Sequence, residues 1–113
     1  MGSEKGIVSG NTTMLILQLL SEKEMYGYEM IETLRQRSNQ IFELKAGTLY
    51  PLLHGLESQG FLDSYEKEFQ GKMRKYYQIT REGKTYLKKR VEEWNAYSEA
   101  VSNVLGGGVY GMA

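Results

Sequence analysis

The chain has 113 residues, of which 41% are hydrophobic and 25% charged, a composition ordinary for one soluble globular domain with a modest core. It has no cysteine and one histidine, which excludes disulfide frameworks, thiol catalysis and nearly every zinc site. The longest apolar run, Met14–Leu17, is far shorter than the ~20 residues of a membrane span, and residues 1–20 show no signal peptide. We therefore expect a cytoplasmic protein with no membrane attachment, no metal and no cofactor.

The formal net charge is zero, but the charges are unevenly distributed. Residues 1–44 hold four Lys/Arg against six Glu, a balance of −2, and residues 91–113 hold three Glu and no base, a balance of −3. Residues 45–90 hold ten basic against five acidic residues, a balance of +5. Because a local field is enough to attract phosphate, nucleic acid remains a candidate partner.

Two helices are predicted in the first third of the chain. Residues 11–13 (Asn-Thr-Thr) offer polar N-cap side chains for a buried helix over residues 14–20. A charged turn over residues 21–25 leads to a second helix, which opens at Tyr26 and fades near Ser38. The apolar stripe of this second helix repeats at helical spacing and consists of Gly27, Met30, Ile31 and Leu34.

A third helix is predicted from leucines spaced i, i+3, i+4 and i+7, which make an apolar stripe of about 100°. These leucines are Leu49, Leu52, Leu53 and Leu56. Proline is tolerated only in a first turn, so Thr48 as N-cap would place Pro51 acceptably, whereas a start near Ala46 would require a distorted first turn. Gly60 is a natural C-cap.

Aromatic and β-favouring residues over 61–69 and 73–79, with Gln70-Gly71 between them, predict a β-hairpin. Thr80 then caps a last helix that runs to about Leu105. Three short helices, a hairpin and a further helix give a mainly α fold with a small β-hairpin (α+β), a winged helix-turn-helix followed by a long helix. The expected organisation is a DNA-binding unit at 10–80, a dimerisation helix at 81–105 and a flexible Gly-rich tail at 106–113.

Three motifs in this order resemble those of the PadR family of bacterial transcriptional regulators. They are MYGYEMIETL (25–34), AGTLYPLLHGLESQGFL (46–62), and RKYYQIT (74–80) with Gly83. The resemblance covers about residues 12–90, and the chain length is similar to that of the short subfamily with a single C-terminal helix. The chain departs from the family at Gly55, where a basic residue is usual, so an operator preference does not carry over.

The resemblance implies a third helix that enters the major groove and a wing that grips phosphate. The recognition-helix residues assigned to DNA are Lys45, Thr48, Tyr50, His54 and Ser58. The wing residues assigned to DNA are Lys72, Arg74 and Lys75, with Arg74 the leading phosphate contact. The plainer alternatives are a solvated helix face and a lysine-rich edge hairpin that keeps the protein soluble.

Apolar residues spaced 4, 3, 4, 3 and 4 along the last helix form a heptad seam. They are Leu87, Val91, Trp94, Ser98, Val101 and Leu105. At 1.5 Å per residue, a helix of about 25 residues is about 37 Å long, more than a small core can cover. We expect a homodimer that presents two recognition helices to an inverted repeat in promoter DNA, with packing inside one subunit as the alternative.

Trp94 is either a core residue of the dimer seam or part of an effector site. The effector hypothesis follows from resemblance to multidrug-responsive family members, and Tyr97, Met14 and Leu15 would complete the pocket. A compact dimer with no extra domain acts most simply by occluding a promoter, so we expect a repressor and not an enzyme. The alternatives from other classes are a winged-helix protein–protein adaptor and a small-molecule sequestering protein.

Overall fold

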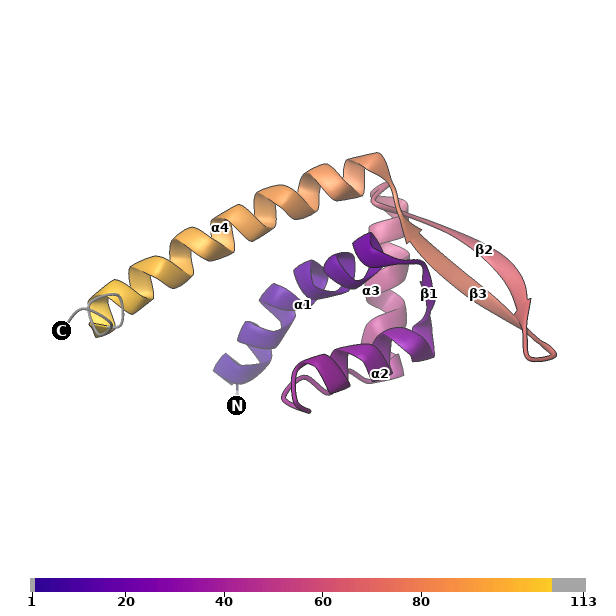
Figure 1. Cartoon of the computed structure of the whole chain (residues 1–113), viewed down its shortest axis with the longest axis horizontal. Helices are drawn as coiled ribbons and strands as arrows, with labels where there is room; N and C mark the ends of the chain where they lie inside the picture. Colours follow the sequence, from indigo (N-terminus) through magenta and orange to yellow (C-terminus); the bar gives the residue numbers. More distant parts are fainter. Residues whose placement is uncertain (1, 107–113) are drawn as a thin grey trace.

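Four helices and a small antiparallel sheet make up the part of the chain that the structure describes (Figure 1). This computed structural model describes the backbone of residues 2–106 and the side chains of residues 11–106. In chain order the elements are α1 (Gly2–Glu22), β1 (Met25–Tyr26), α2 (Gly27–Arg37), α3 (Ala46–Ser58), β2 (Leu62–Phe69), β3 (Lys72–Ile79) and α4 (Arg81–Leu105). The predicted fold class, a winged helix-turn-helix with a long last helix, is confirmed.

The core lies between α1, α2, α3 and the inner face of the sheet. Its fully buried side chains come from all four and include Ile16, Leu17, Met30, Leu49, Leu53, Leu62 and Tyr77. Burying an aliphatic or aromatic side chain of this size stabilises the fold by roughly 1.5–3 kcal/mol. The leucine stripe predicted for the third helix therefore packs inward, which leaves the opposite face of α3 free.

The first helix starts earlier than the sequence predicts. The Asn-Thr-Thr sequence at 11–13 was expected to cap it, but α1 begins at Gly2 and runs through these residues. Thr12 is 5% exposed and belongs to the buried set. Cap propensity is a weak preference, and the packing of Thr12 and Met14 against the core overrides it.

A short strand replaces part of the predicted charged turn. Met25 and Tyr26 form β1, which pairs with Tyr77 and Tyr76 of β3. The sheet order is β1-β3-β2, so β1 forms the edge opposite the hairpin partner β2. Two residues are too few for a periodic signal, which is why the sequence does not reveal this strand.

The third helix begins at Ala46, not after Thr48. Lys45 is the N-cap residue, and its carbonyl accepts hydrogen bonds from the backbone N–H groups of both Thr48 and Leu49, each at 2.9 Å. Such a shared acceptor, with one 3₁₀-type and one α-type bond, is common at helix termini. Pro51 is therefore the sixth helical residue, and the burial of Leu49 fixes the helix despite it.

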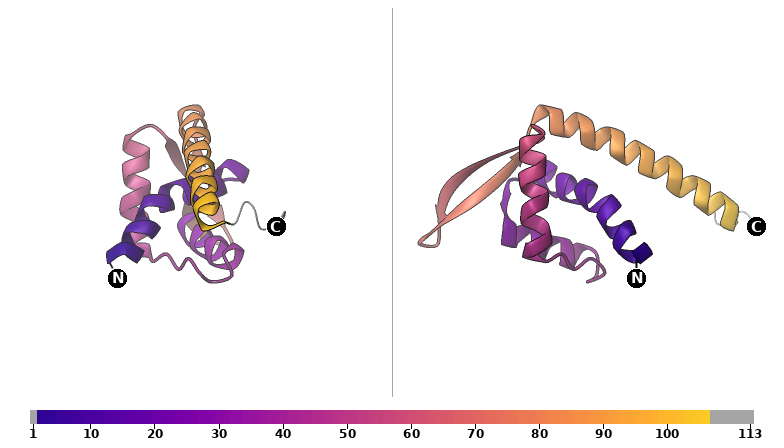
Figure 2. Two further views of the ribbon diagram at one scale, coloured as in Figure 1. Left: turned by 90° about the vertical axis from the view of Figure 1, so that its left-hand side faces the viewer. Right: turned by 180° about the vertical axis from the view of Figure 1, so that it is seen from behind.

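The predicted turns and caps of the second half are confirmed. Gln70 and Gly71 have φ of 55° and 80°, which are the two positive values of a tight hairpin turn, and Gly60 follows α3 with φ of 83°. The Thr80 side chain accepts a hydrogen bond from the Gly83 N–H at 3.0 Å and caps α4. From the hairpin, α4 extends well past the helical body, as Figure 2 shows. Of the predicted tail, residues 107–113 lie outside the described part.

Candidate nucleic-acid interface

One face of α3 is open and free of acidic side chains. Lys45, Thr48, Tyr50, His54 and Ser58, the residues that the sequence assigns to DNA, are all exposed. The only carboxylate of the helix is that of Glu57, which is half-buried and accepts a hydrogen bond from the Ser64 hydroxyl of β2. The open face therefore carries hydroxyl, imidazole and ammonium groups, which suit contacts to phosphate and to base edges.

Tyr50 connects this face to the start of α2. Its hydroxyl lies where a Cβ on Gly27 would stand, so the ring rests against the first residue of α2. The N-cap residue of α2, Tyr26, makes no side-chain cap hydrogen bond. A phenol hydroxyl beside a helix N-terminus is a suitable place for a phosphate oxygen.

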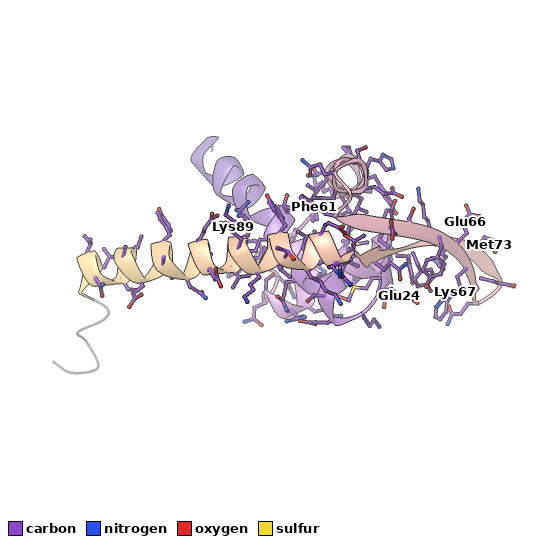
Figure 3. All side chains as sticks on the ribbon, turned by 90° about the horizontal axis from the view of Figure 1, so that it is seen from above. Glu24, Phe61, Glu66, Lys67, Met73 and Lys89 are labelled. Atoms are coloured by element: carbon purple, nitrogen blue, oxygen red, sulfur yellow. The ribbon has the colours of Figure 1, made fainter. Side chains whose placement is uncertain are left out.

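The hairpin forms a wing with two different faces. Cross-strand pairs Leu62–Ile79 and Ser64–Tyr77 lie on the inner face, which continues toward the tip through Glu66–Lys75 and Glu68–Met73. The outer face carries Tyr65–Tyr76, Lys67–Arg74 and Phe69–Lys72. Figure 3 shows Glu66 and Met73 on one side of the hairpin and Lys67 on the other. Along β3, Lys72, Arg74 and Tyr76 therefore lie on one face, and Met73, Lys75 and Tyr77 on the other.

The wing cations have unequal surroundings. Lys72 and Lys75 are exposed, and Lys75 lies with its Nζ 5.6 Å from the centroid of the Tyr77 ring. Lys67 makes an ion pair with Glu24 at 3.2 Å, with its Nζ 4.5 Å from the Tyr76 ring centroid. Arg74 is half-buried. Lys72 and Lys75 are thus the more accessible cations near the tip.

Glu24 lies between α1 and β1 and helps to fix the outer face. A hydrogen bond from Tyr65 and the ion pair with Lys67 hold the pKa of the Glu24 carboxyl below its usual range. The same contact with Glu24 raises the pKa of the Tyr65 hydroxyl. Glu24, Tyr26, Lys67 and Phe69 line an open groove of about 490 Å³ on this side of the wing.

Of the outer-face residues, the sequence assigns Lys72 and Arg74 to DNA but not the β2 residues Tyr65, Lys67 and Phe69. The available signal is the alternation of Tyr65, Lys67 and Phe69 along one strand, which becomes a cluster once the turn fixes the register against Arg74. The sequence does not reveal that Tyr26 belongs to this cluster, because its position depends on the unpredicted strand β1.

The basic middle segment divides into two parts in space. Of the ten basic residues between 45 and 90, four lie on the hairpin and one, Lys45, precedes α3. The other five are on α4, where they are Arg81, Lys84, Lys88, Lys89 and Arg90. Lys89 lies on α4 well away from the wing in Figure 3. The positive field at the open face of α3 therefore comes from fewer residues than the segment total indicates.

The predicted heptad seam also divides in two. Leu87 is buried and Val91 packs against the core, whereas Trp94, Val101 and Leu105 are 41%, 38% and 68% exposed. The second half of α4 therefore carries apolar side chains that the described part of the chain does not cover.

Of the four residues assigned to an effector, two are brought together. The ring centroids of Trp94 and Tyr97 are 6.0 Å apart, and both rings are exposed. Met14 is buried in the core, and Leu15 packs against it. Within the described residues no three metal-ligating side chains form a cluster, and no helix has the length and apolar character to cross a membrane.

Comparison with known proteins places this geometry in a family. The model described as "Transcriptional regulator PadR-like family" matches residues 16–89. A transcriptional regulator of Mycobacterium tuberculosis is 33% identical over 92 residues, 81% of this chain and 80% of the relative. A transcriptional regulator from Clostridium thermocellum has a similar solved structure, with a TM-score of 0.80, 35% identity and coverage of 87% of this chain and 96% of that one. A PadR family transcriptional regulator from Eggerthella lenta gives a TM-score of 0.74 at 34% identity, over 93% and 97% of the two chains. The chain belongs to the PadR-like family of transcriptional regulators.

Proposed function

We propose that this regulator is a cytoplasmic homodimer that binds an inverted repeat in promoter DNA and represses transcription by occluding the promoter. Residues 10–80 bind DNA and residues 81–105 hold the two subunits together. Each subunit places α3 in a major groove, with its wing on the adjacent backbone. The protein acts by binding and, like its relatives, is a transcriptional regulator and not an enzyme.

The observation that carries this proposal is the open face of α3 beside the wing. Thr48 and Tyr50 are placed to donate to phosphate, and Lys45 adds a positive charge at the start of the helix. His54 and Ser58, farther along the same face, approach base edges. In the wing, the exposed Lys72 and Lys75 contact phosphate directly. Arg74 is half-buried and belongs to the same DNA interface.

Titration of labelled DNA from upstream of the gene against scrambled duplex, at two salt concentrations, tests the proposal. We expect tighter binding to the upstream DNA, and Lys72→Met and Lys75→Met should each lower the magnitude of the slope of log K against log salt by about 1.8, which is about 0.9 for each copy in the dimer. Lys88→Met removes the same charge from α4 and is the matched control, with little expected change in slope. Equal affinity for upstream and scrambled DNA would reject sequence-specific binding at this site.

An effector site is a second candidate function, favoured by the exposed pair of Trp94 and Tyr97. Flat aromatic faces at a dimer seam stack on planar or cationic compounds. Trp94 is the only tryptophan, so its fluorescence reports a ligand at this place without labelling. Titration with a panel of planar aromatic cations should quench or shift the emission, and an unchanged spectrum across the panel would rule this candidate out.

A further inference from the structure

The guanidinium of Arg74 lies against two neighbouring aromatic rings. Its Cζ is 4.5 Å from the ring centroid of Tyr26 and 5.9 Å from that of Phe69. The two rings are themselves 6.2 Å apart. The Nε atom of Arg74 is buried and has no hydrogen-bond partner among the described residues. Burial of an unpaired donor is unfavourable, and the electron-rich ring faces are what offset it here.

These two rings belong to different parts of the molecule. Tyr26 is the N-cap residue of α2 and pairs with Tyr76, whereas Phe69 ends β2 just before the turn and pairs with Lys72. Tyr76 and Lys72 are four residues apart on β3, or about 13 Å at 3.3 Å per residue. Arg74 lies midway between them, so its contacts connect the tip of the wing to the start of α2.

A second contact of the same kind lies closer to the base of the wing. Lys67 reaches Glu24 at 3.2 Å across the Tyr76 ring, and Figure 3 shows Glu24 and Lys67 on the same side of the hairpin. Both cations of the central cross-strand pair on the outer face are therefore engaged with the body of the molecule. On the outer face, the tip itself is left with the exposed ammonium of Lys72.

We propose that Arg74 is a positioning residue, which with Tyr26 and Phe69 fixes the wing against the helix-turn-helix. Lys72 is then already in position to contact phosphate when the protein meets DNA. This inference rests on the proposed DNA-binding function. If the wing is correctly placed for only a fraction of the time, the apparent association constant is the intrinsic one multiplied by that fraction, while the contacts in the bound state stay the same. Loss of the stack therefore lowers affinity and leaves the number of phosphate contacts unchanged.

DNA binding separates a positioning role from a direct contact. Phe69→Leu removes no charge, yet it should weaken binding to upstream DNA about 5- to 20-fold with an unchanged salt slope. Phe69→Leu combined with Arg74→Met should weaken binding no further than Arg74→Met alone, because both changes break one stack. Phe69→Tyr restores the ring and should restore the affinity. Lys72→Met, by contrast, should lower the magnitude of the slope by about 1.8 for the dimer, about 0.9 for each copy.

Amide hydrogen exchange in the free protein provides a second measurement that needs no DNA. We expect the backbone amides of residues 66–75 to exchange about 5- to 20-fold faster in Phe69→Leu, with α3 unchanged. Phe69 is 41% exposed, so this variant should keep the cooperative urea transition of the parent.

Two results would overturn the proposal. One is a Phe69→Leu variant that binds DNA normally while Arg74→Met lowers the magnitude of the salt slope by about 1.8 for the dimer, which would make Arg74 a direct phosphate ligand. The other is unchanged exchange of the wing amides in Phe69→Leu. If the parent protein does not distinguish its upstream DNA, the proposed function fails, and the exchange measurement still decides whether Arg74 fixes the wing.

Discussion

Two glycines of this chain have opposite surroundings, although both lie in helices. A Cβ on Gly83 would collide with the Phe61 carbonyl oxygen and with the Ile79 side chain, whereas a Cβ on Gly55 meets nothing within 4 Å. Gly83→Ala should therefore lower the free energy of unfolding by about 1–3 kcal/mol, as overpacking does. Gly55→Ala should raise it by about 0.8–1 kcal/mol, the helix-propensity difference. Urea denaturation of both variants checks this, and a destabilised Gly55→Ala would contradict it.

Gly55 also has a consequence for DNA affinity. It is exposed and lines, with Pro51 and Leu52, an open groove of about 330 Å³ that a longer side chain could enter without a clash. Gly55→Lys adds a cation to α3 at the position where the family usually has one. We expect tighter binding to duplex DNA and a salt slope larger in magnitude by about 1.8 for the dimer, about 0.9 for each copy, measured by titration at several salt concentrations. An unchanged slope would mean that this side of α3 does not reach a phosphate.

At the scale of elements, the contact between β2 and the segment before β1 depends on pH. The pKa of Glu24 is lowered by Tyr65 and Lys67, so the stabilisation is present above the pKa that this carboxyl has in the unfolded chain and is lost as the pH falls through its folded value. In urea denaturation, the stability advantage of the parent over Glu24→Gln should shrink from pH 7 to pH 3.5. The advantage should also be smaller in a Lys67→Met background at pH 7. An advantage that grows toward low pH would contradict this assignment.

The elements that the sequence predicts correctly are those with local signals. The Thr80 cap, the Gln70-Gly71 turn and the leucine stripe of α3 are each determined by residues within one or two turns of chain. The predicted start of α1 is wrong because tertiary packing, and not a local cap, decides where this helix begins. The stack on Arg74 could not be predicted because Tyr26 reaches it only through pairing with a strand about fifty residues later. The residue types show that the wing is basic, but only the register of the strands shows which of its cations contact other side chains.

At the scale of the whole molecule, α4 gives the chain an elongated shape with extents of 57 × 28 × 27 Å. Figure 2 shows its second half extending away from the body, and this is the half with exposed Trp94, Val101, Val104 and Leu105. An amphipathic helix end of this kind gains most by pairing with a copy of itself. In the proposed dimer, this pairing would set the spacing of the two α3 helices, so assembly and DNA recognition are expected to fail together.

Val101→Lys tests this coupling, because it places a charge in the seam without changing the DNA-binding unit. We expect the variant to sediment as a monomer at concentrations where the parent is a dimer. Ala96→Lys, an equal change on the exposed opposite side of α4, should leave the parent dimer intact. The monomeric variant should lose most of its preference for an inverted repeat over a single half-site, because only a dimer engages both half-sites at once. A variant that stays dimeric, or a monomer that keeps the full preference, would show that recognition of the repeat does not depend on this seam.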